Sequence, residues 1–297
     1  MSTAAPNVLI MQSGGPTNVI NASLSGMVDE AICSGGFGRV YGAYRGIEGL
    51  LEDKVNDLTD LLPSYWARVS RTPGALLGST RRKLTPDDVP VILGLLCKYK
   101  IGYWFTIGGN DSALTGHTIF EEAARAGYDL TVVNVPKTVD NDLIMTDHCP
   151  GYGSAARYVA LATMCSAWDS ETLNASSPVT IIEVMGRDAG WLSAASGIAR
   201  REERDAPHLI CVPEKPLIED WFIAKMEEAY TRFGFAVAVI SENTRGPDGV
   251  LGEQTEPYFV DDFGHAYYDG PARYLSGLVA GRLGVPSRFE KPGKAQR

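Results

Sequence analysis

The sequence has no excess of basic residues. Its 297 residues carry 27 Lys and Arg against 36 Asp and Glu, which gives a formal net charge of -9 at pH 7. A protein that binds nucleic acid without sequence preference needs a basic surface to neutralise phosphates, so no nucleic-acid partner is expected. A multiply charged anion would have to be held by local clusters of Lys, Arg and backbone amides, assisted by a metal ion.

The sequence also lacks paired cysteines and long apolar runs. No run approaches the length of a membrane span, and Met1 to Asn7 is not a basic region followed by an apolar stretch, so neither membrane insertion nor export is expected. The cysteines are odd in number and widely scattered, at positions Cys33, Cys97, Cys149, Cys165 and Cys211. This pattern predicts neither a disulfide framework nor a zinc site, and it favours a reducing, cytoplasmic location.

What is present is the composition of an α/β protein with one large or two medium domains, 44% hydrophobic and 21% charged, with 32 Gly and 17 Pro. Two stretches repeat one design, an apolar strand followed by paired glycines and a polar helix start. Val8 to Met11 runs into Ser13-Gly14-Gly15, and Tyr103 to Ile107 runs into Gly108-Gly109-Asn110-Asp111-Ser112.

These glycine turns contain neither GxxxxGK nor GxGxxG, so each one alone is a weak signal. Paired glycines let the backbone approach a phosphate closely, and the amides at the following helix start favour an anion. For the first turn, a plain tight turn between strand and helix is an equally good interpretation, but two such turns in one domain are more telling. Asp111 can reach a magnesium ion or cap the helix that follows it.

A third strand, expected over residues 129–135, leads into the densest polar stretch of the chain, residues 134–142. It contains Lys137, Thr138, Asp140 and Asp142. Polar residues at the carboxyl end of a strand lie where open α/β sheets bind ligands, and a carboxylate beside a lysine can act as a base while the ammonium faces an anion. The alternative is a solvated turn whose Asn and Asp side chains satisfy backbone groups. If the three strands are parallel neighbours, all three polar ends meet at one edge.

A run of three cations, Arg81-Arg82-Lys83, follows a Gly-Ser turn at residues 78–79. It can clamp a phosphate or be merely solvated. Helical spacing predicts helices over residues 87–99 and 119–126.

The pattern restarts after Asp147, and a second doubly wound domain is expected from about residue 146. A long helix is predicted over 153–168, and strands over 179–184, 209–214 and 236–242. The first of these strands enters another glycine turn with a cation, Met185-Gly186-Arg187.

Taken together, these residues resemble the 6-phosphofructokinase family, and its pyrophosphate-dependent branch more closely than its ATP-dependent branch. Six motifs stand in the family's order and spacing: Ser13-Gly14-Gly15, Gly78-Ser79-Thr80-Arg81, Gly108 to Ser112, Pro136 to Asp142, Met185-Gly186-Arg187 and Ser241-Glu242. The resemblance implies two doubly wound, Rossmann-like α/β domains with the active site in the cleft between them. Residues 1–145 would form the domain for the phosphoryl donor and magnesium, and residues 146–297 the domain for fructose 6-phosphate.

By position, the resemblance also implies roles for individual residues. Asp140 would be the general base toward the sugar's 1-hydroxyl, Asp142 would support the loop or the metal, and Thr138 would touch the sugar phosphate or the transferring group. The catalytic set is Asp140, Lys137, Asp142 and Thr138. The donor-binding set is Gly14, Gly15, Arg81, Gly109, Asp111 and Ser112. The sugar-binding set is Thr138, Asp140, Met185, Gly186, Arg187, Glu242 and Arg297.

Two positions favour pyrophosphate as the donor. ATP-dependent members typically have Asp-Gly where this chain has Asn110-Asp111, and a Gly where it has Lys137. A carboxylate at Asp111 would repel the α-phosphate of a nucleotide, whereas Lys137 offers a cation to compact pyrophosphate. The expected reaction is reversible transfer to fructose 6-phosphate, giving fructose 1,6-bisphosphate and phosphate, with Mg²⁺ held by Asp111 and Asn110.

The sequence departs from the family in several places. Asn110 replaces an aspartate that many relatives use for magnesium, and Pro178 replaces an arginine that reaches a neighbouring subunit. His208 falls near the position where allosterically regulated relatives have an effector-site acid, so effector control of that kind is not expected. Relatives continue beyond the position of Arg297, so the chain is expected to be a fragment or a shortened protein with reduced or absent activity.

Three alternatives stay open from the sequence. They are an ATP-dependent 6-phosphofructokinase, an inactive sugar-phosphate-binding paralogue and, more distantly, an NAD or lipid kinase. Sites shared between subunits in relatives imply a homo-oligomer, a dimer or a tetramer.

Overall fold

The computed structural model describes residues 5–253, 256–260 and 266–297, which fold as two compact units. Unit 1 comprises residues 1–138 and 143–151, and unit 2 comprises residues 139–142 and 152–297. The boundary expected after residue 145 therefore falls within a segment of unit 1, and the short segment 139–142, which contains Asp140, belongs to unit 2.

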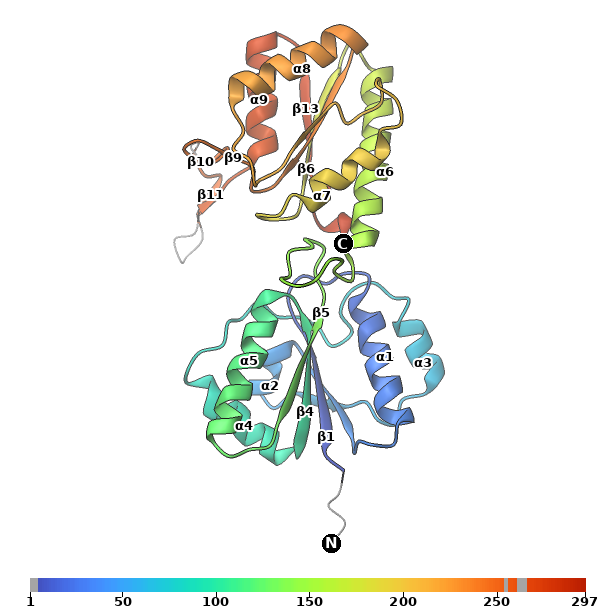
Figure 1. The fold of residues 1–297 in the computed structure, drawn as a ribbon, viewed down its shortest axis with the longest axis vertical. Coiled ribbons are helices and arrows are strands. Elements are labelled where there is room, and N and C mark those ends of the chain that lie inside the picture. The colour runs from blue at the N-terminus through green and yellow to red at the C-terminus, as the bar shows by residue number, and fades with distance from the viewer. Residues whose placement is uncertain (1–4, 254–255, 261–265) are drawn as a thin grey trace. The chain divides into compact units, whose positions relative to one another are not determined.

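Unit 1 is built on a five-stranded sheet in the order β3-β2-β1-β4-β5 (Figure 1). All neighbouring pairs are parallel except β2 with β3, which are antiparallel. The strands are β1 (Asn7–Gln12), β2 (Val40–Ala43), β3 (Val55–Asp57), β4 (Ile101–Gly108) and β5 (Thr131–Pro136). The helices are α1 (Ile20–Cys33), α2 (Gly46–Leu51), α3 (Pro63–Val69), α4 (Asp88–Lys98) and α5 (Asn110–Arg125).

Both faces of this sheet are covered, which explains the continuous apolar runs of its strands. Val8 and Ile10 of β1 pack in one core with α1 and α3. Leu9 and Met11 point to the opposite face and pack in a second core with α2, α4 and α5. Figure 1 shows these two groups of helices on opposite sides of the strands.

Unit 2 has a four-stranded, all-parallel sheet in the order β13-β6-β8-β7. Its strands are β6 (Val179–Val184), β7 (Leu209–Cys211), β8 (Ala236–Ser241) and β13 (Ser287–Glu290). Its helices are α6 (Tyr152–Thr172), α7 (Trp191–Ala195), η1 (Ser196–Ala199), α8 (Glu219–Phe233), α9 (Pro271–Leu283) and η2 (Gly293–Gln296). Two short hairpins complete it, β9 (Arg245–Gly246) with β10 (Gly249–Val250), and β11 (Phe259–Val260) with β12 (Ala266–Tyr267).

The sheet of unit 2 is also covered on both faces. Val179 and Ile181 of β6 pack with α8 and α9. Ile182 and Val184 pack with α6 and α7. The expected fold class of two doubly wound α/β domains is confirmed.

The expected elements occur with shifted ends. The strands expected at 8–11, 103–107, 129–135, 179–184 and 236–242 form, as do the helices at 87–99 and 153–168. The helix expected at 119–126 begins earlier, at Asn110, and the strand expected at 209–214 ends at Cys211, before Pro213. The elements α3, β3, α8, α9 and β13 were not anticipated.

Within the described ranges, no helix combines the length and the apolar character needed to cross a bilayer. The five cysteines are free thiols, and Cys149 and Cys211 are buried.

Candidate active site

The three polar strand ends predicted in unit 1 do meet. Strands β1, β4 and β5 are parallel neighbours, so their carboxyl ends lie at one edge of the sheet. The first is followed by residues 13–15, the second by 109–112 and the third by Lys137. The prediction that the glycine turns and the lysine share one edge is confirmed.

A buried pair of hydroxyls joins the two glycine turns. Ser13 Oγ and Ser112 Oγ share a hydrogen bond, and the two residues are 7% and 6% exposed. Gly108 lies directly beside them, because a Cβ at this position would come 1.9 Å from Ser112 Oγ and 2.8 Å from Ser13 Oγ. Any other residue would displace the serines, so the absence of a side chain at Gly108 allows the hydrogen bond that joins the two turns.

Lys137 connects the third strand end to the first glycine turn. The residue is 4% exposed, and its Nζ donates to the carbonyl oxygen of Gly15 at 2.8 Å. Asn141 is 6% exposed and the Asp140 side chain 15% exposed. The burial of these three residues contradicts a solvated turn at their positions.

The loop that carries Arg81 lies against the same glycine turn. The amide of Gly14 donates to the carbonyl of Thr80 at 3.0 Å, and Ser79 Oγ donates to the carbonyl of Gly14. Arg81 itself is exposed, next to these contacts. Its neighbour Arg82 instead pairs with buried Asp88 at 2.7 Å, so the run of three cations does not act as one clamp.

Asp111 does not cap α5. Gly109 is the N-cap residue of that helix, no side chain makes a capping hydrogen bond, and Asp111 lies exposed in the first helical turn. Among the described residues, no group of three or more His, Cys, Asp or Glu side chains is placed to hold a metal ion. Mg²⁺ usually takes one or two carboxylates together with waters and substrate phosphates, so Asp111 and adjacent Asn110 fit an ion bound mainly through a phosphate ligand.

In unit 2 the Met185-Gly186-Arg187 turn follows β6 and meets Asp140. Arg187 Nε lies 4.0 Å from Asp140 Oδ2. The turn requires glycine, because Gly186 has φ +134° and a Cβ there would lie 2.5 Å from the carbonyl oxygen of Ala189.

The end of β8 fixes the backbone of Arg187. Its amide donates to Glu242 Oε1 at 3.2 Å, and its carbonyl accepts from Ser241 Oγ at 2.9 Å. The Arg187 side chain remains 63% exposed. The structure thus brings together four of the predicted sugar-side residues, Asp140, Gly186, Arg187 and Glu242.

Gln296 is a neighbour of this turn that sequence reasoning missed. Its Oε1 accepts from the amide of Met185 at 3.3 Å, although the two residues are 111 positions apart. The residue is 2% exposed, and within the described structure its Nε2 has no hydrogen-bond partner. Arg297 follows directly, so the predicted arginine is attached to a residue that contacts the turn. No local pattern in the sequence marks Gln296.

A second missed feature, the ion pair of buried Glu183 with exposed Lys291, braces the same turn. Glu183, 5% exposed on β6, accepts from Lys291 Nζ and from the amide of Ala272 at the start of α9. Burial raises the pKa of Glu183, and the bonds from Lys291 and Ala272 oppose that rise. Glu183, one residue before the end of β6 at Val184, is thereby linked to the start of α9 and to Lys291, which follows β13.

Of the remaining predicted residues, Thr138 and Asp142 each lie at a point where the chain passes from one unit to the other. Thr138 is the last residue of the first segment of unit 1 and forms an isolated bridge with Gly151. Asp142 ends the short segment of unit 2 and is partly buried.

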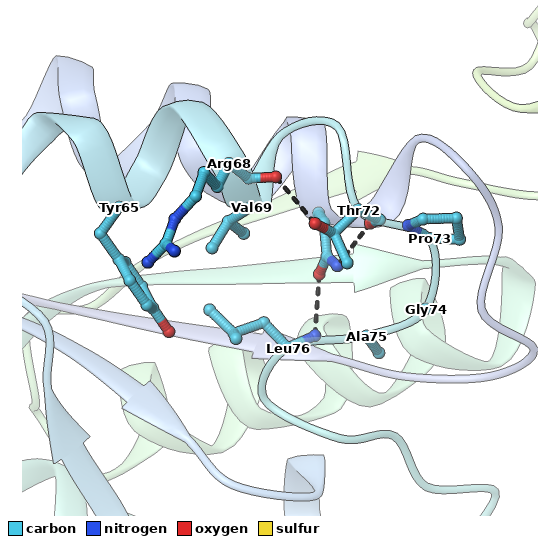
Figure 2. A pocket seen from close by; sticks show the side chains of 9 residues that line it. Tyr65, Arg68, Val69, Thr72, Pro73, Gly74, Ala75 and Leu76 are labelled. Carbon is cyan, nitrogen blue, oxygen red and sulfur yellow. Dashed lines mark hydrogen bonds between the residues drawn. The ribbon is translucent and has the colours of Figure 1, made fainter.

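A separate pocket in unit 1 contains none of the predicted site residues. It has a volume of about 430 Å³ and is formed by α3, Asn21 of α1 and the loop of residues 72–76 (Figure 2). Asn21 holds that loop, donating to the carbonyl of Thr72 at 2.9 Å and accepting from the amide of Leu76 at 2.8 Å. The polar groups of Asn21 are therefore used in shaping the loop, and we assign the pocket no part in the candidate active site.

Comparison with known proteins shows the family of this chain. Residues 7–297 match the family model described as phosphofructokinase. The pyrophosphate--fructose 6-phosphate 1-phosphotransferase of Rhodospirillum rubrum is 38% identical over 275 residues, which cover 92% of this chain and 67% of that protein. An ATP-dependent 6-phosphofructokinase of Streptomyces coelicolor is more distant, at 29% identity over 291 residues, 97% of this chain and 80% of that protein.

The fold agrees as well. The crystal structure of a pyrophosphate-dependent phosphofructokinase from Nitrosospira multiformis superposes with a TM-score of 0.88 at 34% sequence identity, covering 99% of this chain and 70% of that one. With the family model matching nearly the whole chain, this protein belongs to the phosphofructokinase family.

Proposed function

We propose that this protein transfers a phosphoryl group from pyrophosphate to the 1-hydroxyl of fructose 6-phosphate, reversibly, giving fructose 1,6-bisphosphate and phosphate. The observation that carries the proposal is Lys137, a buried cation whose Nζ lies on the carbonyl of Gly15 at the edge where three strand ends meet. A compact, highly charged donor requires a fixed positive charge at this point, because the phosphoryl oxygens gain stabilisation only from groups already in place.

The residues proposed for the donor would attract pyrophosphate and repel a nucleotide. The amides of Gly15 and Gly109, together with Arg81, would bind the phosphates of pyrophosphate, since the amides of Ser13, Gly14 and Ser112 already donate to backbone carbonyls. The exposed carboxylate of Asp111 would repel the additional phosphate of a nucleotide in the same position. We infer that Lys137 and Asp111 select pyrophosphate over ATP.

The sugar side supplies the base. Asp140 would take the proton of the 1-hydroxyl while O1 attacks one phosphorus of pyrophosphate, the bridging P–O bond breaks and phosphate leaves. Arg187 Nε, 4.0 Å from Asp140 Oδ2, would help to hold this carboxylate in place. Met185, Gly186, Glu242, Thr138 and Arg297 would orient the sugar phosphate, and Asp142 would support the loop.

Asp111 and Asn110 would hold Mg²⁺ together with the donor's phosphates. The ion, when bound, neutralises part of the donor's charge and aligns it for in-line transfer. We also propose a cytoplasmic location, supported by the free thiols at all five cysteines, and a homo-oligomeric state.

The test is an assay with fructose 6-phosphate and each donor in turn, coupled to detection of fructose 1,6-bisphosphate. Turnover with pyrophosphate and little with ATP is expected. Robust turnover with ATP and none with pyrophosphate would overturn the donor assignment. Calorimetric binding of fructose 6-phosphate without turnover with either donor would instead support a binding protein that lacks catalysis.

A further inference from the structure

The carboxylate of Glu183 is buried in unit 2, and the ammonium of Lys291 compensates its charge. Lys291 Nζ lies 2.7 Å from Glu183 Oε1 and reaches it from an exposed position directly after β13. A buried charge that loses its partner is left uncompensated, whereas replacing both partners by neutral groups costs much less. The positions of the two residues are therefore coupled.

The start of α9 closes directly over this ion pair. Lys291 Nζ also donates to the carbonyl oxygen of Asp269 at 2.7 Å, and Glu183 Oε2 accepts from the amide of Ala272 at 3.1 Å. Between these two contacts lies Gly270, the N-cap residue of α9, with φ +87°. A Cβ at Gly270 would lie 2.7 Å from Glu183 Oε2 and 2.8 Å from Lys291 Nζ, so the backbone itself encloses both charged groups.

Lys291 begins the segment that carries two residues of the sugar side. Gln296, in η2 of this segment, accepts from the amide of Met185 at 3.3 Å, and Arg297 follows it. Met185 is two residues after Glu183 in the sequence. The segment of residues 291–297 is therefore attached to the end of β6 at two points, once by the ion pair and once by the bond from Gln296.

Glu183 also interacts electrostatically with Glu242, the residue that holds the backbone of Arg187. Burial raises the pKa of Glu183, the ammonium of Lys291 opposes that rise, and the nearby negative charge of Glu242 adds to it. Glu242 Oε1 accepts from the amide of Arg187 at 3.2 Å. Lys291 thus offsets a repulsion that acts on the carboxylate holding Arg187 in place.

We propose that Lys291 is a positioning residue for fructose 6-phosphate, which fixes the turn of residues 185–187 and the segment of residues 291–297 relative to each other through its ion pair. The inference rests on the proposed function, which assigns Arg187 and Arg297 to the sugar phosphate. Because the Arg187 side chain is exposed, the placement of its backbone determines where the guanidinium can meet the ligand. Lys291 acts on the sugar only through these neighbours, since its Nζ is held by a carboxylate and a carbonyl.

The first test separates KM from kcat in the full chain. Lys291→Met should raise KM for fructose 6-phosphate about tenfold and change kcat less than about twofold, because the reacting groups stay in place. KM for pyrophosphate should not change. Adding Glu183→Gln to Lys291→Met removes the uncompensated buried charge and should return KM for the sugar to within about threefold of the parent value. Lys225→Met, at an exposed lysine that pairs with Glu228, is the matched control and should leave all three values unchanged.

The second test needs no substrate. Hydrogen exchange of the Met185 and Arg187 amides in the ligand-free chain should be about tenfold faster in Lys291→Met than in the parent, and the double variant should restore it.

The two tests distinguish this proposal from the proposed function. A parent chain that neither binds nor converts fructose 6-phosphate contradicts the proposed function, whereas unchanged exchange of both amides in Lys291→Met overturns the positioning role. A variant that melts at a lower temperature with unchanged KM and unchanged exchange would show that the ion pair only stabilises the fold. A double variant whose KM for the sugar stays as high as that of Lys291→Met also overturns the proposal.

Discussion

In unit 1 the residues proposed for the donor are held by buried contacts. In unit 2 the main sugar-side cation, Arg187, is held mainly through its backbone and keeps an exposed side chain 4.0 Å from Asp140. Lys137 is 4% exposed, and Ser13 and Ser112 share a buried hydrogen bond. The Arg187 side chain is 63% exposed, while Glu242 and Ser241 fix its amide and carbonyl. A buried polar group that loses its partner costs stability, but an exposed side chain loses only the interactions it makes with a ligand. Substitutions in unit 1 should therefore reduce stability and activity together, and those in unit 2 should separate the two.

The largest expected effect is on catalysis in unit 2. Asp140→Asn keeps the shape of the side chain and removes the proposed base, so kcat should fall by about 10²- to 10⁴-fold with little change in melting temperature. Steady-state rates with pyrophosphate and a thermal melt measure both quantities. Asp188→Asn is the control, since Asp188 is 69% exposed and pairs with Arg245, and it should keep most of the activity. Equal rates for the two variants would remove Asp140 from the role of base.

The next effect tests the buried cation of unit 1. Lys137→Met should lower kcat/KM for pyrophosphate about a hundredfold, because a preorganised positive charge on the donor is lost. It should also lower the melting temperature, since the carbonyl of Gly15 loses its buried donor. Lys98→Met changes an exposed lysine that pairs with Asp53 and should change neither value appreciably. A loss confined to KM for fructose 6-phosphate would contradict the assignment of Lys137 to the donor.

A smaller effect is expected at the hydroxyl pair that joins the glycine turns. Ser13→Ala or Ser112→Ala should each reduce the free energy of unfolding by about 1 kcal/mol. The double variant should cost less than the two single changes together, because the second change removes a hydroxyl that has already lost its partner. Urea unfolding measures all three, with Ser64→Ala on the exposed start of α3 as the control. Strict additivity would mean that the hydrogen bond contributes nothing.

The smallest effect near neutral pH is the pH dependence of the free energy of unfolding that arises from His208 in unit 2. Burial between Phe233 and Phe235 lowers the pKa of His208 from 6.5 to about 4. Between pH 6.5 and 4 the unfolded chain binds a proton at this histidine and the folded chain does not. The contribution of His208 to the free energy of unfolding is therefore complete above pH 6.5 and is lost as the pH falls toward 4. His208→Asn keeps an acceptor for the amide of Val237 and should flatten this part of the stability curve.

The control for this pH dependence is His117→Asn, at a histidine whose side chain is 63% exposed. Unfolding free energies measured between pH 4 and 7 distinguish the two histidines. Parallel curves for the parent chain and His208→Asn would show that another group causes the acid sensitivity.

Much of the fold could be predicted because its central strands are buried on both faces. Strands β1, β4, β6 and β8 are short apolar runs, and each of the four is followed by a glycine turn or a polar residue that marks the strand end. The elements that were missed have weaker local signals. Helix α9 contains Gly277 and Gly281, which lower helix propensity, and β13 is an edge strand whose residues are mostly exposed.

The sequence by itself determined the fold class, the position of the glycine turns and the polar stretch of residues 134–142, because periodicity and turn residues act over a few neighbouring positions. Only the tertiary structure decided that Lys137 is buried against Gly15, that Ser13 bonds Ser112 and that Gln296 reaches Met185. The members of these pairs lie 99 or more residues apart. Such contacts follow from the order of the strands in each sheet, which local sequence patterns do not contain.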